Sequence, residues 1–250
     1  MDKFILLARF WNDSEWMDAA LEHIDYWGAD EIYICEGNWD KKFPARSIDD
    51  TLEKINSWAE GKLNVHIVEN LRDDDNYRVN QAETSNLVMK LANIESGDWM
   101  MIVDCDHFYF KDDIDAYKEC MERCVFTYPK FKVYNFLDGI NRYYEREDKN
   151  SSKLPYRVIN GAKWIPTNHL AIDGKMYESL NITFLPTTIT GYHYPLARTK
   201  KRLKDKYNIG DRESPIKWNN GKMMKNLDEY NGEHPEFVIE TLTSLGYING

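Results

Sequence analysis

The stretch Trp99-Met-Met-Ile-Val-Asp104-Cys-Asp106-His-Phe-Tyr-Phe110 decides the fold. Its apolar run, Met100 to Val103, is too short for a helix and suits a buried central strand. The run ends in two carboxylates one residue apart. Because side chains alternate along an extended chain, Asp104 and Asp106 are expected to point the same way. Like charges held this close repel each other unless a cation lies between them or one takes a proton. A hard divalent ion with oxygen ligands is the simplest candidate for that cation.

Strand and helix signals alternate ahead of this stretch. Apolar strand runs occupy residues 4–8, 31–35 and 63–68, and apolar residues at helical spacing occupy 17–27, 48–58 and 87–94. Polar residues that we expect to cap these helices lie at 12–14, 47–50 and 80–83. The alternation predicts a mainly parallel sheet with helices on its faces. In such sheets, ligands bind at the carboxyl ends of the strands, which is where Asp104 and Asp106 lie.

The pattern changes after Phe110. A short helix is expected to begin at Asp112 or Asp113, and another after Pro235. Short strands are expected between them, at residues 125–128, 156–159, 163–165, 181–185 and 187–194. The predicted fold class is therefore α/β: a single αβα sandwich with a mainly parallel central sheet, plus a smaller mixed β region and a C-terminal extension.

Composition excludes several classes of protein. The chain has 250 residues and a formal net charge of -10, which argues against a non-specific nucleic-acid binder. It contains no apolar run of transmembrane length and no signal-peptide layout at its N-terminus. Its four cysteines, Cys35, Cys105, Cys120 and Cys124, lack the paired spacing of a zinc site. We therefore expect reduced thiols and a cytoplasmic protein.

The arrangement resembles the GT-A fold glycosyltransferases, which are nucleotide-sugar-dependent, DxD-containing enzymes, here of the family-2 type. The resemblance rests on Val103-Asp-Cys-Asp106, on Glu36-Gly37-Asn38 after the second strand, and on Gly-Tyr-His193-Tyr followed by a basic segment. It covers residues 3–110 well and 155–206 loosely. It implies a Rossmann-like nucleotide-sugar-binding half over 1–110 and an acceptor half over 111–206. Together these form a catalytic domain over 1–206, on which an extension over 207–250 packs.

The resemblance implies a metal-dependent transfer of a sugar from a nucleoside diphosphate, most often UDP in this family. Mn²⁺ or Mg²⁺ would neutralise the diphosphate leaving group, and an imidazole ligand favours Mn²⁺. The implied metal ligands are Asp104, Asp106 and His193. In the family's Ala-Arg-Asn sequence, only Asn86 of Thr84-Ser85-Asn86 matches. The implied donor-binding residues are Arg9, Glu36, Asn86, Asp104, Arg198 and Lys201.

The catalytic base and the acceptor stay open at this point. Some inverting members of the family have a His-Glu pair that follows an Arg-bearing strand and a Trp. Arg157, Trp164 and His169 occur in this order here, but Leu170 stands in place of the Glu. His169 could serve as the base because the pKa of histidine is near neutral, and Asp173 is the nearby alternative. Aromatic residues between 130 and 195 suit a glycan, a lipid-linked sugar, a protein or a modified nucleic-acid base as acceptor.

Three other functions would use the same acidic pair. A haloacid-dehalogenase-like phosphatase also places Asp-x-Asp after an apolar strand, but near the start of its chain and without an aromatic residue such as Phe108 behind it. A nucleotidyltransferase shares the sheet and the metal chemistry, but residues 4–8 are not followed by its Gly-rich loop. The third is a non-catalytic carbohydrate- or nucleotide-binding module. Loss of nucleotide-sugar hydrolysis in Asp106→Asn, with binding retained, would distinguish an enzyme from that module.

Overall fold

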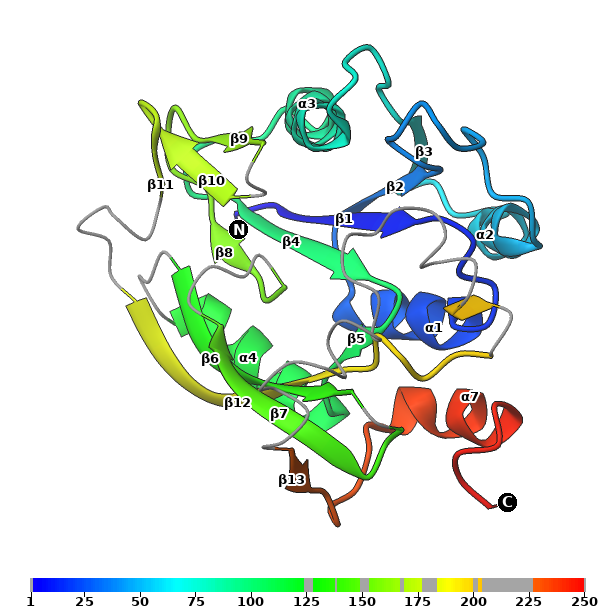
Figure 1. The fold of residues 1–250 in the computed structure, drawn as a ribbon. Coiled ribbons are helices and arrows are strands. Elements are labelled where there is room, and N and C mark those ends of the chain that lie inside the picture. Colours follow the sequence, from blue (N-terminus) through cyan, green and yellow to red (C-terminus); the bar gives the residue numbers. More distant parts are fainter. Residues whose placement is uncertain are drawn as a thin grey trace.

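The computed structural model describes residues 2–123, 128–137, 139–148, 153–166, 169–176, 184–199, 202–203 and 227–249. Within these ranges the strands form three sheets, and Figure 1 shows helices packed around them. No helix of the described ranges is long and apolar enough to cross a membrane.

The first sheet has the strand order β3-β2-β1-β4-β8. The first four of these strands are mutually parallel, and β8 runs antiparallel to β4. The mainly parallel sheet predicted from the sequence is thus confirmed. The bounds are β1 Phe4–Phe10, β2 Glu31–Glu36, β3 Val65–Glu69, β4 Trp99–Asp104 and β8 Tyr156–Arg157.

Helices cover both faces of this sheet, so the predicted αβα sandwich is confirmed. Leu6 and Ala8 of β1 pack in one core with α1 (Met17–Trp27) and Ile55 of α2 (Thr51–Ala59). Ile5 and Leu7 point to the other face and pack in a second core with Val88 of α3 (Tyr77–Leu91). Every residue of β1 is buried, which explains why this strand reads as a continuous apolar run.

The predicted cap positions of α1 and α3 were wrong, whereas α2 begins directly after Asp50, inside the predicted segment 47–50. Helix α1 begins after Trp16 and α2 after Asp50, and neither residue makes a side-chain cap bond. The Ser47 hydroxyl accepts a hydrogen bond from the backbone of Asn12 at 2.8 Å. Helix α3 is capped by Asn76, four residues before the predicted segment.

The second half of the chain adds two smaller sheets. One has the order β13-β7-β6-β12-β5 and mixes parallel with antiparallel pairs; the other has the order β11-β10-β9. The described residues 184–185 and 187–193 of two predicted strands belong to one long strand, β12, and the pairing of β5 with it was not predicted. Residues 181–183 of the first predicted strand lie outside the described residues. The bounds are β5 His107–Phe108, β6 Tyr128–Phe136, β7 Arg142–Asp148, β9 Lys163–Ile165, β10 His169–Ile172, β11 Lys175–Met176, β12 Phe184–His193 and β13 Asp228–Glu229.

Two helical segments of the second half match prediction. Helix α4 (Lys111–Arg123) follows Phe110, and a 3-10 turn, Glu236–Val238, leads into α7 (Ile239–Ser244) after Pro235. The ring of Phe237 lies 5.1 Å from that of His23, so this C-terminal segment packs on α1. Cys35 and Cys105 are buried and Cys120 is partly buried; their reduced state stays a prediction. The predicted strand at 125–127, Cys124 and the predicted boundary at residue 206 lie outside the described residues.

Candidate functional site

The strand order reverses between β1 and β4, which makes this pair the topological switch point of the sheet. Open α/β sheets bind their ligands at the carboxyl ends of the strands at such a point. Here Arg9, the next-to-last residue of β1, is in register with Asp104, the last residue of β4. Arg9 Nη2 lies 3.3 Å from Asp104 Oδ1. The predicted acidic pair is therefore at the place where the fold favours a ligand.

Asp106 is brought to His193 by the short strand β5. This strand pairs antiparallel with the end of β12, so that His107 lies opposite His193. His193 Nε2 is 3.5 Å from Asp106 Oδ1. On the other side of the ring, Nδ1 is 2.9 Å from Asn135 Oδ1, and the Asn135 amide nitrogen donates to two backbone carbonyls. The ring of His193 thus lies between the Asn135 amide oxygen at Nδ1 and the Asp106 carboxylate at Nε2.

Arg198 connects Asp106 to a second carboxylate, Asp13. Its Nη2 donates to Asp106 Oδ2 at 2.9 Å and to Cys105 Sγ at 3.2 Å, and its Nη1 donates to Asp13 Oδ1 at 3.0 Å. The side chain of Arg198 is only 1% exposed. Arg202 Nη2 lies 3.7 Å from the same Asp13 oxygen. Breaking such a buried network would leave charges uncompensated, so Arg198 holds the two carboxylates in place.

Lys153 makes the closest contact to Asp104. Its ammonium donates to Asp104 Oδ2, while Arg9 occupies the other oxygen. Burial alone would raise the pKa of Asp104, but the charges of Lys153 and Arg9 outweigh it and hold that pKa well below its ordinary value. Asp104 is therefore a carboxylate at neutral pH, and its charge is balanced by cationic side chains.

The predicted metal does not fit this arrangement. Each oxygen of Asp104 and Asp106 already faces a nitrogen, from Arg9, Lys153, His193 or Arg198. Within the described ranges, no group of three or more His, Cys, Asp or Glu side chains is placed to hold a metal ion. A divalent ion would also meet the positive charges of Lys153 and Arg198 at close range. Binding of Mn²⁺ or Mg²⁺ stays a prediction, and no step of the reaction proposed below depends on it.

Two predicted donor-binding residues are engaged elsewhere. The carboxylate of Glu36, which is buried, accepts from the Ser47 backbone at 2.8 Å and pairs with Arg46 at 3.3 Å. Asn86 exchanges two hydrogen bonds with the backbone of Trp164, at 2.8 and 3.1 Å. Both side chains thus hold loops and strands together, and their contacts with a nucleotide stay predictions.

The two candidates for the catalytic base lie in the small sheet. His169 begins β10, and Asp173 follows it in the turn before β11, with Asp173 and Gly174 both at positive φ. Figure 1 shows this sheet near α3, on the side away from the carboxyl ends of β1 and β4. The structure therefore does not bring these residues to the acidic pair, and their role as base stays a prediction. Lys201, also predicted to bind the donor, lies outside the described residues.

Comparisons with known proteins find distant likeness among solved structures. No protein-family model and no curated protein matches the chain. Among solved structures, the chain is similar to a protein described as 4-diphosphocytidyl-2C-methyl-D-erythritol synthase. The identity is 11%, the TM-score is 0.41, and the match covers 76% of this chain and 90% of the other. A likeness at this level does not identify a function.

Two members of the charged cluster carry no sequence signal for the site. Lys153 lies in a polar stretch, and Asp13 reads as a helix cap. His107 is a third buried polar residue beside the acidic pair, and its ring lies 5.7 Å from that of His193. Helix α1 begins only after Trp16, three residues beyond Asp13, so this acid does not cap it. No pattern in the sequence marks Lys153.

Proposed function

We propose that this protein is a glycosyltransferase that takes a sugar from a nucleoside diphosphate, with a UDP-sugar as the first donor to test. The observation that carries the proposal is the placement of Arg9, Asp104 and Asp106 at the switch point between β1 and β4. The resemblance of these residues to a DxD motif supports the same reaction class. The acceptor stays open among a glycan, a lipid-linked sugar, a protein and a modified nucleic-acid base.

The cationic side chains at the switch point suit the leaving group of this reaction. In glycosyl transfer, the bond between the anomeric carbon and the phosphate oxygen breaks, and its electron pair stays on the diphosphate. The acceptor hydroxyl oxygen bonds to the anomeric carbon and gives its proton to a base. Fixed positive charges near the diphosphate stabilise the charge that develops on it. Lys153 and Arg202 are the described cations of this cluster that are most open to solvent.

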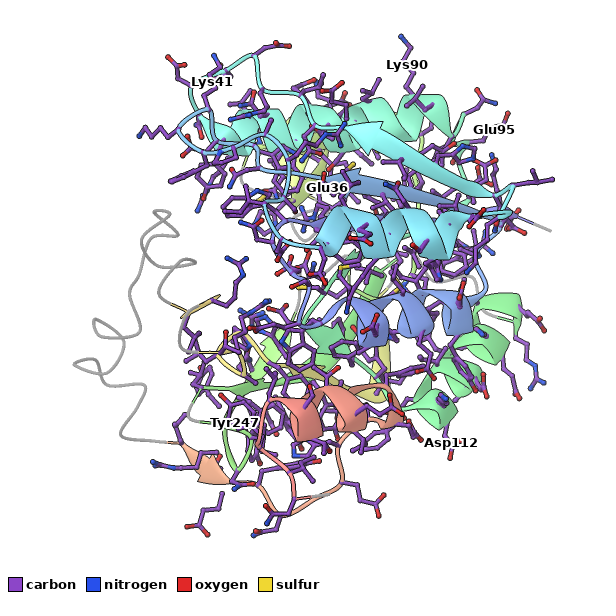
Figure 2. All side chains as sticks on the ribbon, turned by 90° about the vertical axis from the view of Figure 1, so that its right-hand side faces the viewer. Glu36, Lys41, Lys90, Glu95, Asp112 and Tyr247 are labelled. Atoms are coloured by element: carbon purple, nitrogen blue, oxygen red, sulfur yellow. The ribbon has the colours of Figure 1, made fainter. Side chains whose placement is uncertain are left out.

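The test is release of nucleoside diphosphate from a panel of sugar nucleotides, measured with and without Mn²⁺. We expect at least one donor to be hydrolysed slowly. The rate should fall about 100-fold in Asp104→Asn, because that carboxylate positions Lys153 and Arg9. Asp112→Asn is the matched control, since Asp112 points away from the protein at the start of α4 (Figure 2). Circular dichroism would verify that both variants fold.

Two results would reject the proposal. One is that no sugar nucleotide is hydrolysed and no nucleoside diphosphate binds. The other is that p-nitrophenyl phosphate is hydrolysed in a reaction that depends on Asp104 while sugar nucleotides are left intact; that result would favour the phosphatase alternative.

A further inference from the structure

The acidic pair is neutralised by side chains that come from distant parts of the chain. Among the described residues, the switch point gathers three carboxylates and four cations. The carboxylates are Asp13, Asp104 and Asp106; the cations are Arg9, Lys153, Arg198 and Arg202. Counted over these seven described side chains, cations outnumber carboxylates by one. Such a site attracts an anion and repels a further cation.

The four cations differ in how far solvent reaches them. The side chain of Arg198 is 1% exposed and that of Arg9 is 6% exposed, whereas Arg202 is 11% and Lys153 is 16% exposed. Arg198 and Arg9 are therefore enclosed by the protein. Lys153 combines the greatest exposure of the four with direct contact to the acidic pair. An ammonium has three N–H donors, the groups that bind phosphate oxygens, and Lys153 directs one of them to Asp104 Oδ2.

The backbone from Lys153 to Pro155 is anchored by two tyrosine hydroxyls. The Tyr109 hydroxyl donates to the Lys153 carbonyl at 3.0 Å, and the Tyr117 hydroxyl donates to the Pro155 carbonyl at 2.6 Å. Leu154, between these two carbonyls, is fully buried. Lys153 is thus held at its base by buried contacts, unlike a lysine on a free surface loop. A cation fixed in this way loses little further freedom when it binds an anion.

We propose that Lys153 takes the place of a divalent metal at this site and binds the diphosphate of the donor directly. This inference rests on the proposed function and names the group that receives the leaving diphosphate. It predicts that the protein binds a diphosphate in the presence of a chelator. It also predicts that Mn²⁺ alone has no strong site next to Asp104 and Asp106.

The experiment uses inorganic pyrophosphate and Mn²⁺ as separate probes of the full-length protein. Calorimetric titration with pyrophosphate in EDTA should show binding, and Lys153→Gln should weaken it about tenfold or more through the lost charged hydrogen bond. Lys153→Arg should retain most of the affinity. Lys90→Gln, at an exposed lysine that points away from the protein at the end of α3 (Figure 2), should change nothing. Paramagnetic resonance of free Mn²⁺ should show no uptake by the wild-type protein at sub-millimolar metal.

Several outcomes would overturn the inference. The inference fails if pyrophosphate does not bind, or binds only with Mn²⁺ present. It also fails if wild type and a folded Lys153→Gln bind pyrophosphate equally well, or if the wild-type protein takes up Mn²⁺. Failure of the inference is distinguishable from failure of the proposed function. If sugar-nucleotide hydrolysis requires Mn²⁺ and is unchanged in Lys153→Gln, the inference fails and the proposed glycosyl transfer is retained. If pyrophosphate binds in EDTA but no sugar nucleotide is hydrolysed, only the proposed glycosyl transfer fails.

Discussion

His23 should make the protein lose stability in mild acid. This side chain is fully buried in α1 among aromatic rings, and burial lowers its pKa from 6.5 to about 3. Its Nε2 accepts a hydrogen bond from Trp27 Nε1 at 3.1 Å, which requires that nitrogen to be unprotonated. Protonation would therefore both bury a charge and break this bond.

The size of the effect follows from the two pKa values. The unfolded chain binds a proton at His23 below about pH 6.5, whereas the folded chain does not until about pH 3. The neutral ring therefore contributes its full stabilisation above pH 6.5, and this contribution falls as the pH drops from 6.5 toward 3. Each pH unit in this window costs about 1.4 kcal/mol, which gives a loss of about 2 kcal/mol by about pH 5.

Urea unfolding at about pH 7.5 and about pH 5 measures this loss when wild type is compared with His23→Gln. The glutamine oxygen can still accept from Trp27, but it does not titrate. We expect the variant to gain about 2 kcal/mol relative to wild type on acidification. His66→Gln, at an exposed histidine on the edge strand β3, should keep the wild-type pH dependence. Equal acid dependence of wild type and His23→Gln would refute the reasoning.

Two further predictions concern the site. Arg198→Met should lower the free energy of unfolding, measured in urea, by about 3–5 kcal/mol. The reason is that the Asp13 and Asp106 carboxylates would stay buried without their shared cation. A loss below about 1 kcal/mol would show that other groups balance these carboxylates. Gly191→Ala should lower thermal stability by about 1–3 kcal/mol, since the added Cβ would lie 2.4 Å from His107 Nε2. Combining it with His107→Ala should recover part of that loss, and additive effects in this double-mutant cycle would contradict the proposed clash.

The first sheet could be predicted because its strands carry their own pattern. A strand that is buried on both faces, such as β1, reads as an unbroken apolar run, and α1 and α2 show helical spacing behind their strands. The acidic pair could be placed for the same reason, since it directly follows such a run in β4. Local composition was enough for each of these predictions.

The rest of the site depends on contacts between segments far apart in sequence, which local patterns do not encode. His193 reaches Asp106 through the pairing of β5 with β12. Lys153 reaches Asp104 because two buried tyrosines hold the backbone around it. Ser47 does not cap α2 for a related reason: it has a backbone partner, Asn12, 35 residues away that competes with the helix end.

The bridge from Asp13 through Arg198 to Asp106 also has a consequence for the order of events during synthesis. Arg198 is separated from the two acids by 185 and 92 residues. Strands β1, β2, β3 and β4 leave the ribosome long before Arg198 does, and domains fold from the N-terminus as they emerge. Until then, the growing chain holds two acids that cannot be enclosed without cost. The residue that encloses both acids is therefore made after every strand of the first sheet, and we expect chains that end before Arg198 to leave the switch point open to water.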